Sequence, residues 1–229
     1  APNDRVHKDG DMCLHDMGGE FHCYTSDITN SFPSNGKFTE DQKMIYEAVL
    51  AANWGVMDKM KPGVDFVKMH EHAHRCILTR LEQGGLVVGD VEDMMAANLG
   101  AVFMPHGLGH FMGKDTHDVG GYLDSMPPRP KLDGYKSLRT ACILEPNMVI
   151  TVEPGCYFID YCLDKALADP AQEKFFNKEV LKRFRGFGGC RLEDDVLITE
   201  TGIENFTWAP RLIADVEAVC QGKIVDRFS

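Results

Sequence analysis

Residues 11–32 read DMCLHDMGGEFHCYTSDITNSF, and this stretch decides the first part of the predicted fold. It has few helix formers at helical spacing, and Gly18-Gly19 divides two runs with the composition of strands. A glycine turn between two such runs predicts a pair of antiparallel strands. Each run also carries an acidic residue, Asp16 in the first and Asp27 in the second, where a buried strand should be apolar.

Two long helices are expected downstream of these strands. Thr39-Glu40-Asp41-Gln42 fits a capping box, and apolar residues follow at helical spacing until Pro62-Gly63 ends the helix. The second helix should begin after Asp65 as its N-cap and end at Gly84-Gly85. A short third helix is predicted after Gly89.

The second half of the chain combines a long loop with further strands. Residues 103–144 are rich in Gly, Pro and His without periodicity, so we expect a functional loop region there. Strands are predicted at 148–153 and 190–199, a helical stretch at 170–185, and a last short helix at 213–220. Strand pairs that flank helices and recur late in the chain predict an α+β fold in one domain, not a parallel βαβ sheet.

Composition narrows the possible functions. The formal net charge of −11 argues against a nucleic-acid groove or an anionic membrane surface, because both need clustered Lys and Arg. The eight cysteines show neither a C-x-x-C pair nor zinc-like spacing, so we expect reduced, mostly buried thiols. No stretch approaches the roughly 20 apolar residues of a membrane span, and no charged-then-apolar leader opens the sequence. These features predict a soluble, cytosolic protein.

Five ionisable residues occupy positions where the chain should be apolar. A carboxylate in a buried strand must be paired or must bind metal, because the bare charge is costly to bury. Four carboxylates cannot all pair with one histidine, whereas two divalent cations would satisfy them. An oxygen-rich set with one imidazole suits manganese or a similar metal better than a thiolate-loving one. The five candidate ligands are Asp16, Asp27, His110, Glu153 and Glu193.

Simpler explanations apply to each signal taken alone. Asp16 and Asp27 could be turn or strand-end carboxylates, and Glu153 could simply end a strand. The H-x-x-x-H spacing of His106 and His110 is weak, because the intervening glycines disfavour a regular helix. The order of the five residues along the chain is more informative than any one of them.

Other polar clusters are given ordinary structural roles. His70, His72 and His74 look like ligands, but on a helix only His70 and His74 share a face. No carboxylate is placed to complete a metal site there. Asp194 and Asp195 are expected to be solvated charges at a strand end.

Several short segments around the candidate ligands have a distinctive sequence. They are Asp16 to Glu20, Asp27 to Thr29, Phe32-Pro33, Gly36 to Phe38, His106 to Gly113, His117 to Tyr122, Thr151 to Gly155 and Gly186 to Gly189. In these segments, and in the ligand order D-D-H-E-E, the chain resembles the pita-bread metallopeptidases, which include methionine aminopeptidase, aminopeptidase P, creatinase and prolidase. The similarity covers essentially the whole chain and is greatest to the prolidase group of the animal cytosolic type.

The resemblance implies a role for each ligand. Asp16 would bind one metal ion, and Asp27 and Glu193 would bridge both. His110 and Glu153 would complete the second ion's shell. Two manganese ions, or other divalent metals, would then hold a bridging water that attacks the scissile bond. Glu153 would also pass a proton to the leaving nitrogen.

The resemblance also implies substrate contacts. His117 would contact the substrate carbonyl, and His106 would have a supporting catalytic role. Arg139 and Arg191 would grip the carboxylate of a carboxy-terminal proline, because a guanidinium fork suits that group. Arg191 and Glu193 lie two residues apart on a predicted strand and should therefore share a face. The implied activity is hydrolysis of Xaa-Pro dipeptides.

Two other functions remain open. An enzyme like aminopeptidase P would keep all five ligands but remove the first residue from longer Xaa-Pro peptides. A catalytically poor fragment would act only as a binding module. The two arginines and the prolidase-like segments favour a dipeptide substrate over a longer Xaa-Pro peptide.

The resemblance carries expectations about the domain as well. It implies a pita-bread fold, incomplete at its amino-terminal side, over residues 1–229. The opening helices and one strand of that domain, and the family's amino-terminal domain, would be absent. This chain alone would then hydrolyse Gly-Pro poorly, and its parent protein would be a homodimer. Asn147 stands where the family usually has glycine, and asparagine tolerates the left-handed backbone of such a turn.

Overall fold

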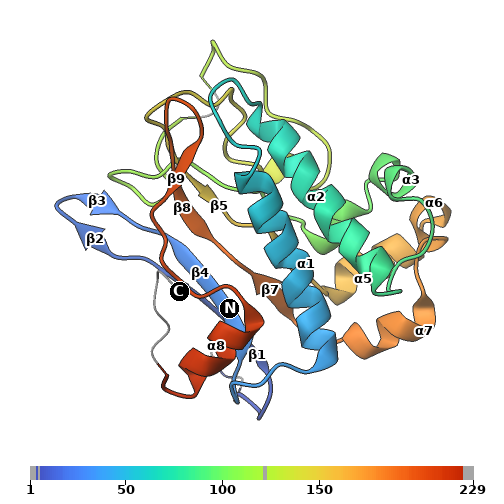
Figure 1. Cartoon of the computed structure of the whole chain (residues 1–229). Coiled ribbons are helices and arrows are strands. Elements are labelled where there is room, and N and C mark those ends of the chain that lie inside the picture. Colours follow the sequence, from blue (N-terminus) through green and yellow to red (C-terminus); the bar gives the residue numbers. More distant parts are fainter. Residues whose placement is uncertain (1–3, 5, 121–122, 224–229) are drawn as a thin grey trace.

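The strands of the molecule lie together, and two long helices pack across them (Figure 1). The computed structural model describes residues 4, 6–120 and 123–223. Gly121 and Tyr122, which end one of the segments singled out in the sequence, lie outside the described residues. The combination of antiparallel strands and packed helices is the α+β class predicted above.

The first strands pair antiparallel as predicted, but the chain reverses at His22-Cys23, where both φ angles are positive, and not at Gly18-Gly19. Strand β1 (Met12–Met17) pairs antiparallel with β4 (Ile28–Pro33), and the register places Asp16 opposite Thr29. Between them a small hairpin of β2 (Glu20–Phe21) and β3 (Tyr24–Thr25) projects from the molecule (Figure 1). Gly18 is needed at the base of this hairpin, since a Cβ there would lie 1.8 Å from the carbonyl oxygen of Ser26.

The remaining strands form two short antiparallel groups. Strands β5 (Val149–Val152), β8 (Asp194–Ile198) and β9 (Ile203–Asn205) form one, and β6 (Gly155–Tyr157) pairs with β7 (Gly189–Arg191) in the other. A bridge between Thr29 and Glu193 connects β4 to the two-residue segment between β7 and β8. Strands β6 and β9 were not predicted, because three residues are too few to show an alternating pattern.

The two long helices begin at the positions that their N-cap motifs predicted. Helix α1 (Glu40–Met57) opens with the capping box, in which the Gln42 N–H donates to Thr39 Oγ1 at 3.3 Å and the Thr39 N–H donates to Gln42 Oε1 at 2.9 Å. Helix α2 (Phe66–Gln83) follows Asp65, whose carboxylate accepts from Val67 N at 2.9 Å. Helix α1 packs against α2 on one side and against β5, β6 and β7 on another.

The predicted helical stretch at 170–185 is interrupted in the structure. Phe175 and Phe176 leave the helix and turn into the core, where Val88 N donates to Phe175 O at 2.8 Å. New caps at Asp169 and Asn177 therefore start two separate short helices. The shorter helices are α3 (Val91–Ala96), α4 (Gly100–Phe103), α5 (Asp160–Leu167), α6 (Pro170–Glu173), α7 (Lys178–Leu181) and α8 (Ile213–Cys220), with 3₁₀ turns at Tyr135–Ser137 and Lys182–Phe184.

Three smaller expectations have clear outcomes. Helix α8 has the predicted bounds, and helices α4 and α5 were not predicted. Residues 104–120 and 123–148 are mostly irregular, as expected for a loop region. Asn147 has a φ of 71°, which confirms the predicted left-handed turn.

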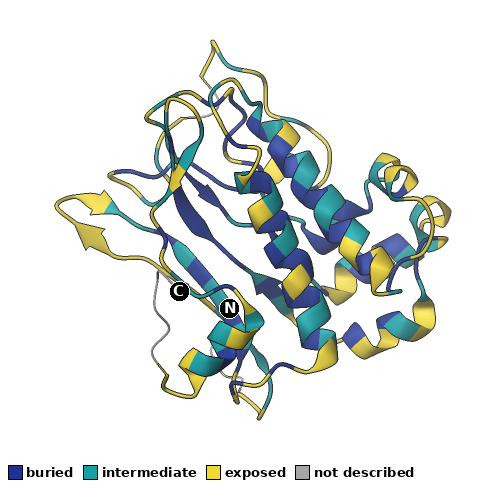
Figure 2. Cartoon of the chain, viewed as in Figure 1, coloured by how far each residue is buried: buried dark blue, intermediate teal, exposed yellow. Residues whose placement is uncertain are grey.

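The helices present one buried face to the strands and one exposed face to solvent (Figure 2). A single large core runs between α1, α2 and the strands.

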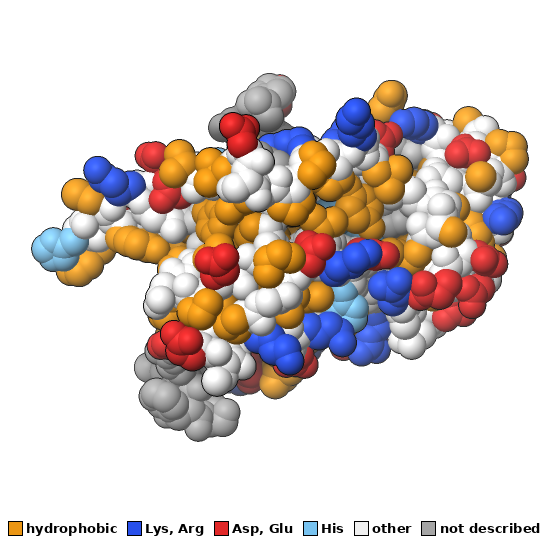
Figure 3. All heavy atoms as spheres, turned by 90° about the horizontal axis from the view of Figure 1, so that it is seen from above, with side chains coloured by type: hydrophobic (Ala, Val, Ile, Leu, Met, Phe, Trp, Pro, Cys, Tyr) orange, Lys and Arg blue, Asp and Glu red, His pale blue; other side chains and the backbone are white. Residues whose placement is uncertain are grey.

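All eight cysteines are free, and four of them are buried, so burial is less general than predicted. Seen from above, hydrophobic side chains gather across the middle of the surface while Lys and Arg lie among Asp and Glu (Figure 3), so the charges of this face are mixed in sign. Within residues 4, 6–120 and 123–223, no helix is both long and apolar enough to cross a membrane.

Candidate metal centre

The first two carboxylates come from the ends of the β1–β4 pair. Asp16 lies near the end of β1, and Asp27 directly precedes β4. Because the strands are antiparallel and joined by the hairpin, the end of one lies beside the beginning of the other. The Asp27 N–H donates to both carboxylate oxygens of Asp195, at 3.1 and 3.3 Å, which fixes the backbone where the second ligand begins.

The other two carboxylates come from strands more than 120 residues further along the chain. Glu153 directly follows β5, and Glu193 lies between β7 and β8. Glu193 N donates to Thr29 O at 3.1 Å, and Thr29 Oγ1 donates to Glu193 Oε2 at 2.5 Å. These two bonds bring the acidic ends of both strand groups to one place.

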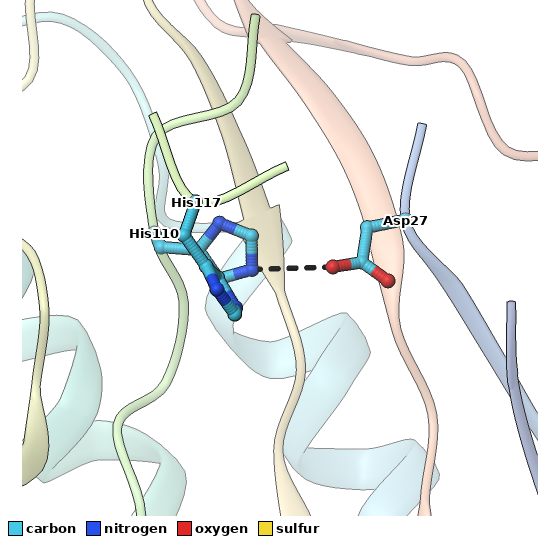
Figure 4. Close-up of side chains that lie close together, drawn as sticks. All are labelled: Asp27, His110 and His117. Atoms are coloured by element: carbon cyan, nitrogen blue, oxygen red, sulfur yellow. Dashed lines mark ion pairs between the residues drawn. The ribbon is translucent and has the colours of Figure 1, made fainter. Parts of the chain in front are cut away.

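His110 enters the site from the irregular loop region. Its backbone bonds to Thr151, with His110 N donating to Thr151 Oγ1 at 3.0 Å and Thr151 N donating to His110 O at 3.0 Å. The ring Nδ1–H donates to Phe111 O at 3.0 Å, which turns Nε2 toward the carboxylates. Nε2 lies 3.4 Å from Asp27 Oδ2 and 3.5 Å from Glu153 Oε1, and Figure 4 shows the ring pointing at Asp27.

The structure brings all five predicted ligands together. Three overlapping groups of possible metal ligands each have their donor atoms within 4.8 Å of one another. They surround a cavity of about 330 Å³, whose wall also includes His106, His117, Arg139 and Arg191. The three groups are Asp27, His110 and His117; His110, Glu153 and Glu193; and Asp16, Asp27 and Glu193.

The buried carboxylates lack enough positive charge around them. Burial, followed by the nearby Glu153 carboxylate, raises the pKa of Glu193 to about 9. Burial also raises the pKa of Glu153 to about 7. Burial alone would raise the pKa of Asp27 too, but hydrogen bonds with His110 and Asp16 outweigh it and lower the value. Divalent cations would compensate this cluster, and its oxygen-rich donor set with imidazole nitrogen fits such ions.

Arg191 reaches into the cluster from the end of β7. Its guanidinium donates to Tyr157 Oη at 3.0 Å and to Thr29 Oγ1 at 3.2 Å, and it forms an ion pair with Asp16. Its Nε lies 3.9 Å from Glu193 Oε2, so the two side chains share a face as predicted. Two polar anchors therefore hold this cation beside the carboxylates.

Arg139 and the two other histidines line the same cavity. Arg139 is exposed, and its charge helps to lower the pKa of His117, after burial and the His110 charge. The His117 ring lies edge-on to His110 with centroids 4.4 Å apart (Figure 4). His106 donates through Nδ1 to Gly107 O at 2.7 Å, and burial lowers its pKa to about 4, so this ring is neutral at pH 7.

The prediction that Asp194 and Asp195 are solvated is wrong. They are only 2% and 4% exposed. Asp194 accepts from Asn53 Nδ2 at 2.8 Å and pairs with Arg211 at 3.2 Å. Burial raises the pKa of Asp195 to about 6. Both residues begin β8, whose other residues are apolar. The argument that a charge in a buried strand needs a partner, which identified Glu193, therefore applied to them as well.

The histidines set aside in the sequence lie elsewhere. His70 and His74 are buried on α2 with ring centroids 4.5 Å apart, and His72 Nε2 lies 3.5 Å from Cys76 Sγ. The possible metal-binding groups of the described residues do not include any of the three. Sequence reasoning missed Thr29, Tyr157 and Arg211, whose contacts depend on strands that are distant in the sequence.

Comparisons with known proteins identify a peptidase family. The model of metallopeptidase family M24 matches residues 1–200. The chain is 60% identical to mouse Xaa-Pro dipeptidase and 58% identical to the human enzyme of that name, in each case over 97% of this chain and 45% of the relative. It thus spans about half the length of the curated relatives it matches.

Solved structures are similar as well. Aminopeptidase PepP from Pseudomonas aeruginosa has a TM-score of 0.77 and 38% identity, over 96% of this chain and 43% of that one. Zinc-substituted aminopeptidase P from Escherichia coli, in complex with product, has a TM-score of 0.74 and 35% identity, also over 96% of this chain and 43% of that one. This likeness confirms the predicted pita-bread fold.

Proposed function

The chain belongs to metallopeptidase family M24, which implies a divalent metal, and we propose that it forms the catalytic portion of a dinuclear Xaa-Pro dipeptidase. The observation that carries the proposal is the convergence of four carboxylates and His110 on one cavity that two arginines also line. Residues 1–229 are proposed to act as a single catalytic unit.

The five converging side chains would hold two ions, for which we propose manganese. Asp16 would bind one ion, and Asp27 and Glu193 would contact both. His110 and Glu153 would serve the other, with the His110 ring held by its bond to Phe111 O. When bound, such ions would polarise the scissile carbonyl and lower the pKa of a water molecule toward neutrality.

Glu153 is suited to move a proton. Burial raises its pKa to about 7 in the metal-free chain, and a bound cation would lower that value, so the proposed proton transfer rests on its place in the cavity wall. Thr151 Oγ1 donates to Glu153 Oε1 at 3.4 Å, and His106 Nδ1 lies 3.9 Å from Glu153 Oε2. We assign Glu153 to deliver a proton to the leaving proline nitrogen, with neutral His106 beside it.

The proposed substrate ends in a carboxylate at proline. Arg191 and Arg139 supply two guanidinium groups on the wall of the cavity, and a planar fork can bind a carboxylate through two parallel bonds. Such bonds would position a free carboxylate one residue beyond the cleaved bond, as in a dipeptide. His117 faces the same cavity, where its ring could donate to the substrate carbonyl.

A second candidate is an Xaa-Pro aminopeptidase that acts on longer peptides. The similar fold of aminopeptidase P favours it. The two arginines argue for the dipeptide, because a longer peptide has no carboxylate at that position. A binding module without catalysis would keep the cavity but show no turnover.

The metal-loaded chain should be tested on Gly-Pro and on a tripeptide that begins with Gly-Pro. Asp27→Asn is the inactive control. We expect a higher kcat/KM for the dipeptide. Preference for the tripeptide would favour the aminopeptidase. Turnover by this chain alone is expected to be low, so the binding module is favoured only if metal binds and turnover is no higher than that of Asp27→Asn.

Two broader expectations remain proposals. We propose a cytoplasmic location, which eight free thiols support because reducing compartments keep cysteines unpaired. We also propose a homodimeric parent protein, which light scattering at several concentrations would test. Neither nucleic acid nor a membrane is a proposed partner, in keeping with the net charge of −11.

A further inference from the structure

We propose that Arg211 is a positioning residue for the metal centre, because its guanidinium binds both the strand after Asp27 and the short segment between β7 and β8 that carries Glu193. The proposal rests on the metal site assigned under the proposed function and concerns how that site keeps its shape. Arg211 lies between β9 and α8, and only 8% of its surface is exposed.

The two ends of the guanidinium fork bind different strands. Nη1 donates to Thr29 O at 2.9 Å and to Asn30 Oδ1 at 2.5 Å, both on β4. Nη2 donates to Glu193 O at 2.6 Å and lies 3.2 Å from Asp194 Oδ1. One planar group therefore contacts both β4 and the segment between β7 and β8.

These contacts lie where the two halves of the site join. In the described part of the chain, β4 pairs through its backbone with the segment between β7 and β8 at a single bridge, between Thr29 and Glu193. Thr29 O accepts from both Glu193 N and Arg211, and Asp27 lies two residues before it. Asp27 and Glu193 are the proposed bridging ligands, so a shift at this bridge would change the spacing that both ions need.

The surroundings of Arg211 hold it in one orientation. Asp194 balances its buried charge and is itself fixed by Asn53 Nδ2 at 2.8 Å and Asn205 Nδ2 at 3.2 Å. Tyr46 Oη donates to Arg211 O at 2.9 Å, which anchors the main chain. A rigid fork can satisfy two carbonyls and a carboxylate together, whereas the single nitrogen of lysine cannot span them.

Divalent metal binding tests the role directly. Arg211→Lys and Arg211→Met should each lower the affinity for Mn²⁺, measured by calorimetry, by about 10- to 100-fold, the usual effect of losing a group that orients metal ligands. The visible absorption of bound Co²⁺ should also change, because it reports coordination geometry. Asn30→Ala, a milder change, should lower affinity less but in the same direction.

Two controls separate positioning from general destabilisation. Ile77→Val trims a buried side chain on α2, which does not line the metal cavity. Leu81→Ala opens the core on α2, away from the site. Both should lower the melting temperature of the metal-free chain while Mn²⁺ affinity and the Co²⁺ spectrum stay as in the wild type.

The outcomes are distinct. Lower affinity in the Arg211 variants, with unchanged affinity in controls of equal melting temperature, supports the proposal. Wild-type affinity in Arg211→Lys and Arg211→Met, or an equal loss in the controls, overturns it. Should neither Arg211 variant fold, Asn30→Ala decides by the same criterion. A wild-type chain that binds no Mn²⁺ would refute the metal site itself.

Discussion

Replacement of Glu193 by glutamine is expected to stabilise the metal-free chain at alkaline pH and to abolish its stabilisation by metal. The carboxylate is 2% exposed, and burial together with Glu153 raises its pKa to about 9 from an ordinary 4.5. The folded chain therefore binds a proton that the unfolded chain has released. The proton that the folded chain retains on Glu193 stabilises it fully below about pH 4.5. This stabilisation is lost as the pH rises through 4.5 to 9.

The magnitude follows from this window. One retained proton is worth about 1.4 kcal/mol per pH unit, which gives an upper bound of about 5 kcal/mol between pH 4.5 and pH 8. Glu153 shares the proton, so we expect roughly half, about 2 to 3 kcal/mol. For a chain of this size that is about 4 to 12 °C in melting temperature. Glutamine keeps the acceptor for Thr29 Oγ1 and carries no charge.

Thermal unfolding in a chelator at pH 5 and pH 8 measures the effect. Glu193→Gln should match the wild type at pH 5 and melt higher at pH 8. Added Mn²⁺ at 100 times its Kd should then raise the free energy of unfolding of the wild type by about 2.7 kcal/mol and leave the variant unchanged. Glu47→Gln, on the exposed face of α1, is the matched control. The reasoning fails if the variant and the wild type have the same pH dependence, or if metal stabilises both equally.

Three further predictions follow from individual contacts. Arg191→Ala and Arg139→Ala should each cost about 2 to 4 kcal/mol of transition-state binding in kcat/KM for Gly-Pro with normal metal content, and unchanged kinetics would remove that residue from the substrate site. Asp195→Ala should lower the free energy of unfolding by about 1 to 3 kcal/mol, because the buried Asp27 N–H loses its acceptor; a melting temperature equal to wild type would contradict this. Thr39→Ala should cost about 1 kcal/mol through loss of the α1 cap without altering metal affinity, and a loss of Mn²⁺ binding would show that the cap affects the site.

Features that depend on neighbouring residues were predictable from the sequence. The capping box at Thr39, the Asp65 cap and the bounds of α8 all follow from hydrogen bonds and apolar spacing within a few residues. The same holds for the antiparallel pairing of the first strands, but not for the place where the chain reverses. The candidate ligands were found because charges are improbable in buried strands, whatever those strands pack against.

Features that depend on distant partners were not predictable in this way. Phe175 and Phe176 break a helical pattern because the core has room for them, and local propensity does not contain that information. Asp194 was expected to be solvated because its cation, Arg211, stands 17 positions later in an irregular segment. A short strand such as β9 exists only because β8 offers it a partner.

The sequence by itself determined which residues could bind metal, where the main helices start and which segments could form strands, since each depends on side-chain chemistry and short-range periodicity. Only the tertiary structure decided that these residues meet. Thr29 and Glu193 bond across 164 positions, and Asp27 and Asp195 across 168. Such pairs form because burial of the common core brings the strands together, and each buried charge must then find its partner among whatever the fold places beside it.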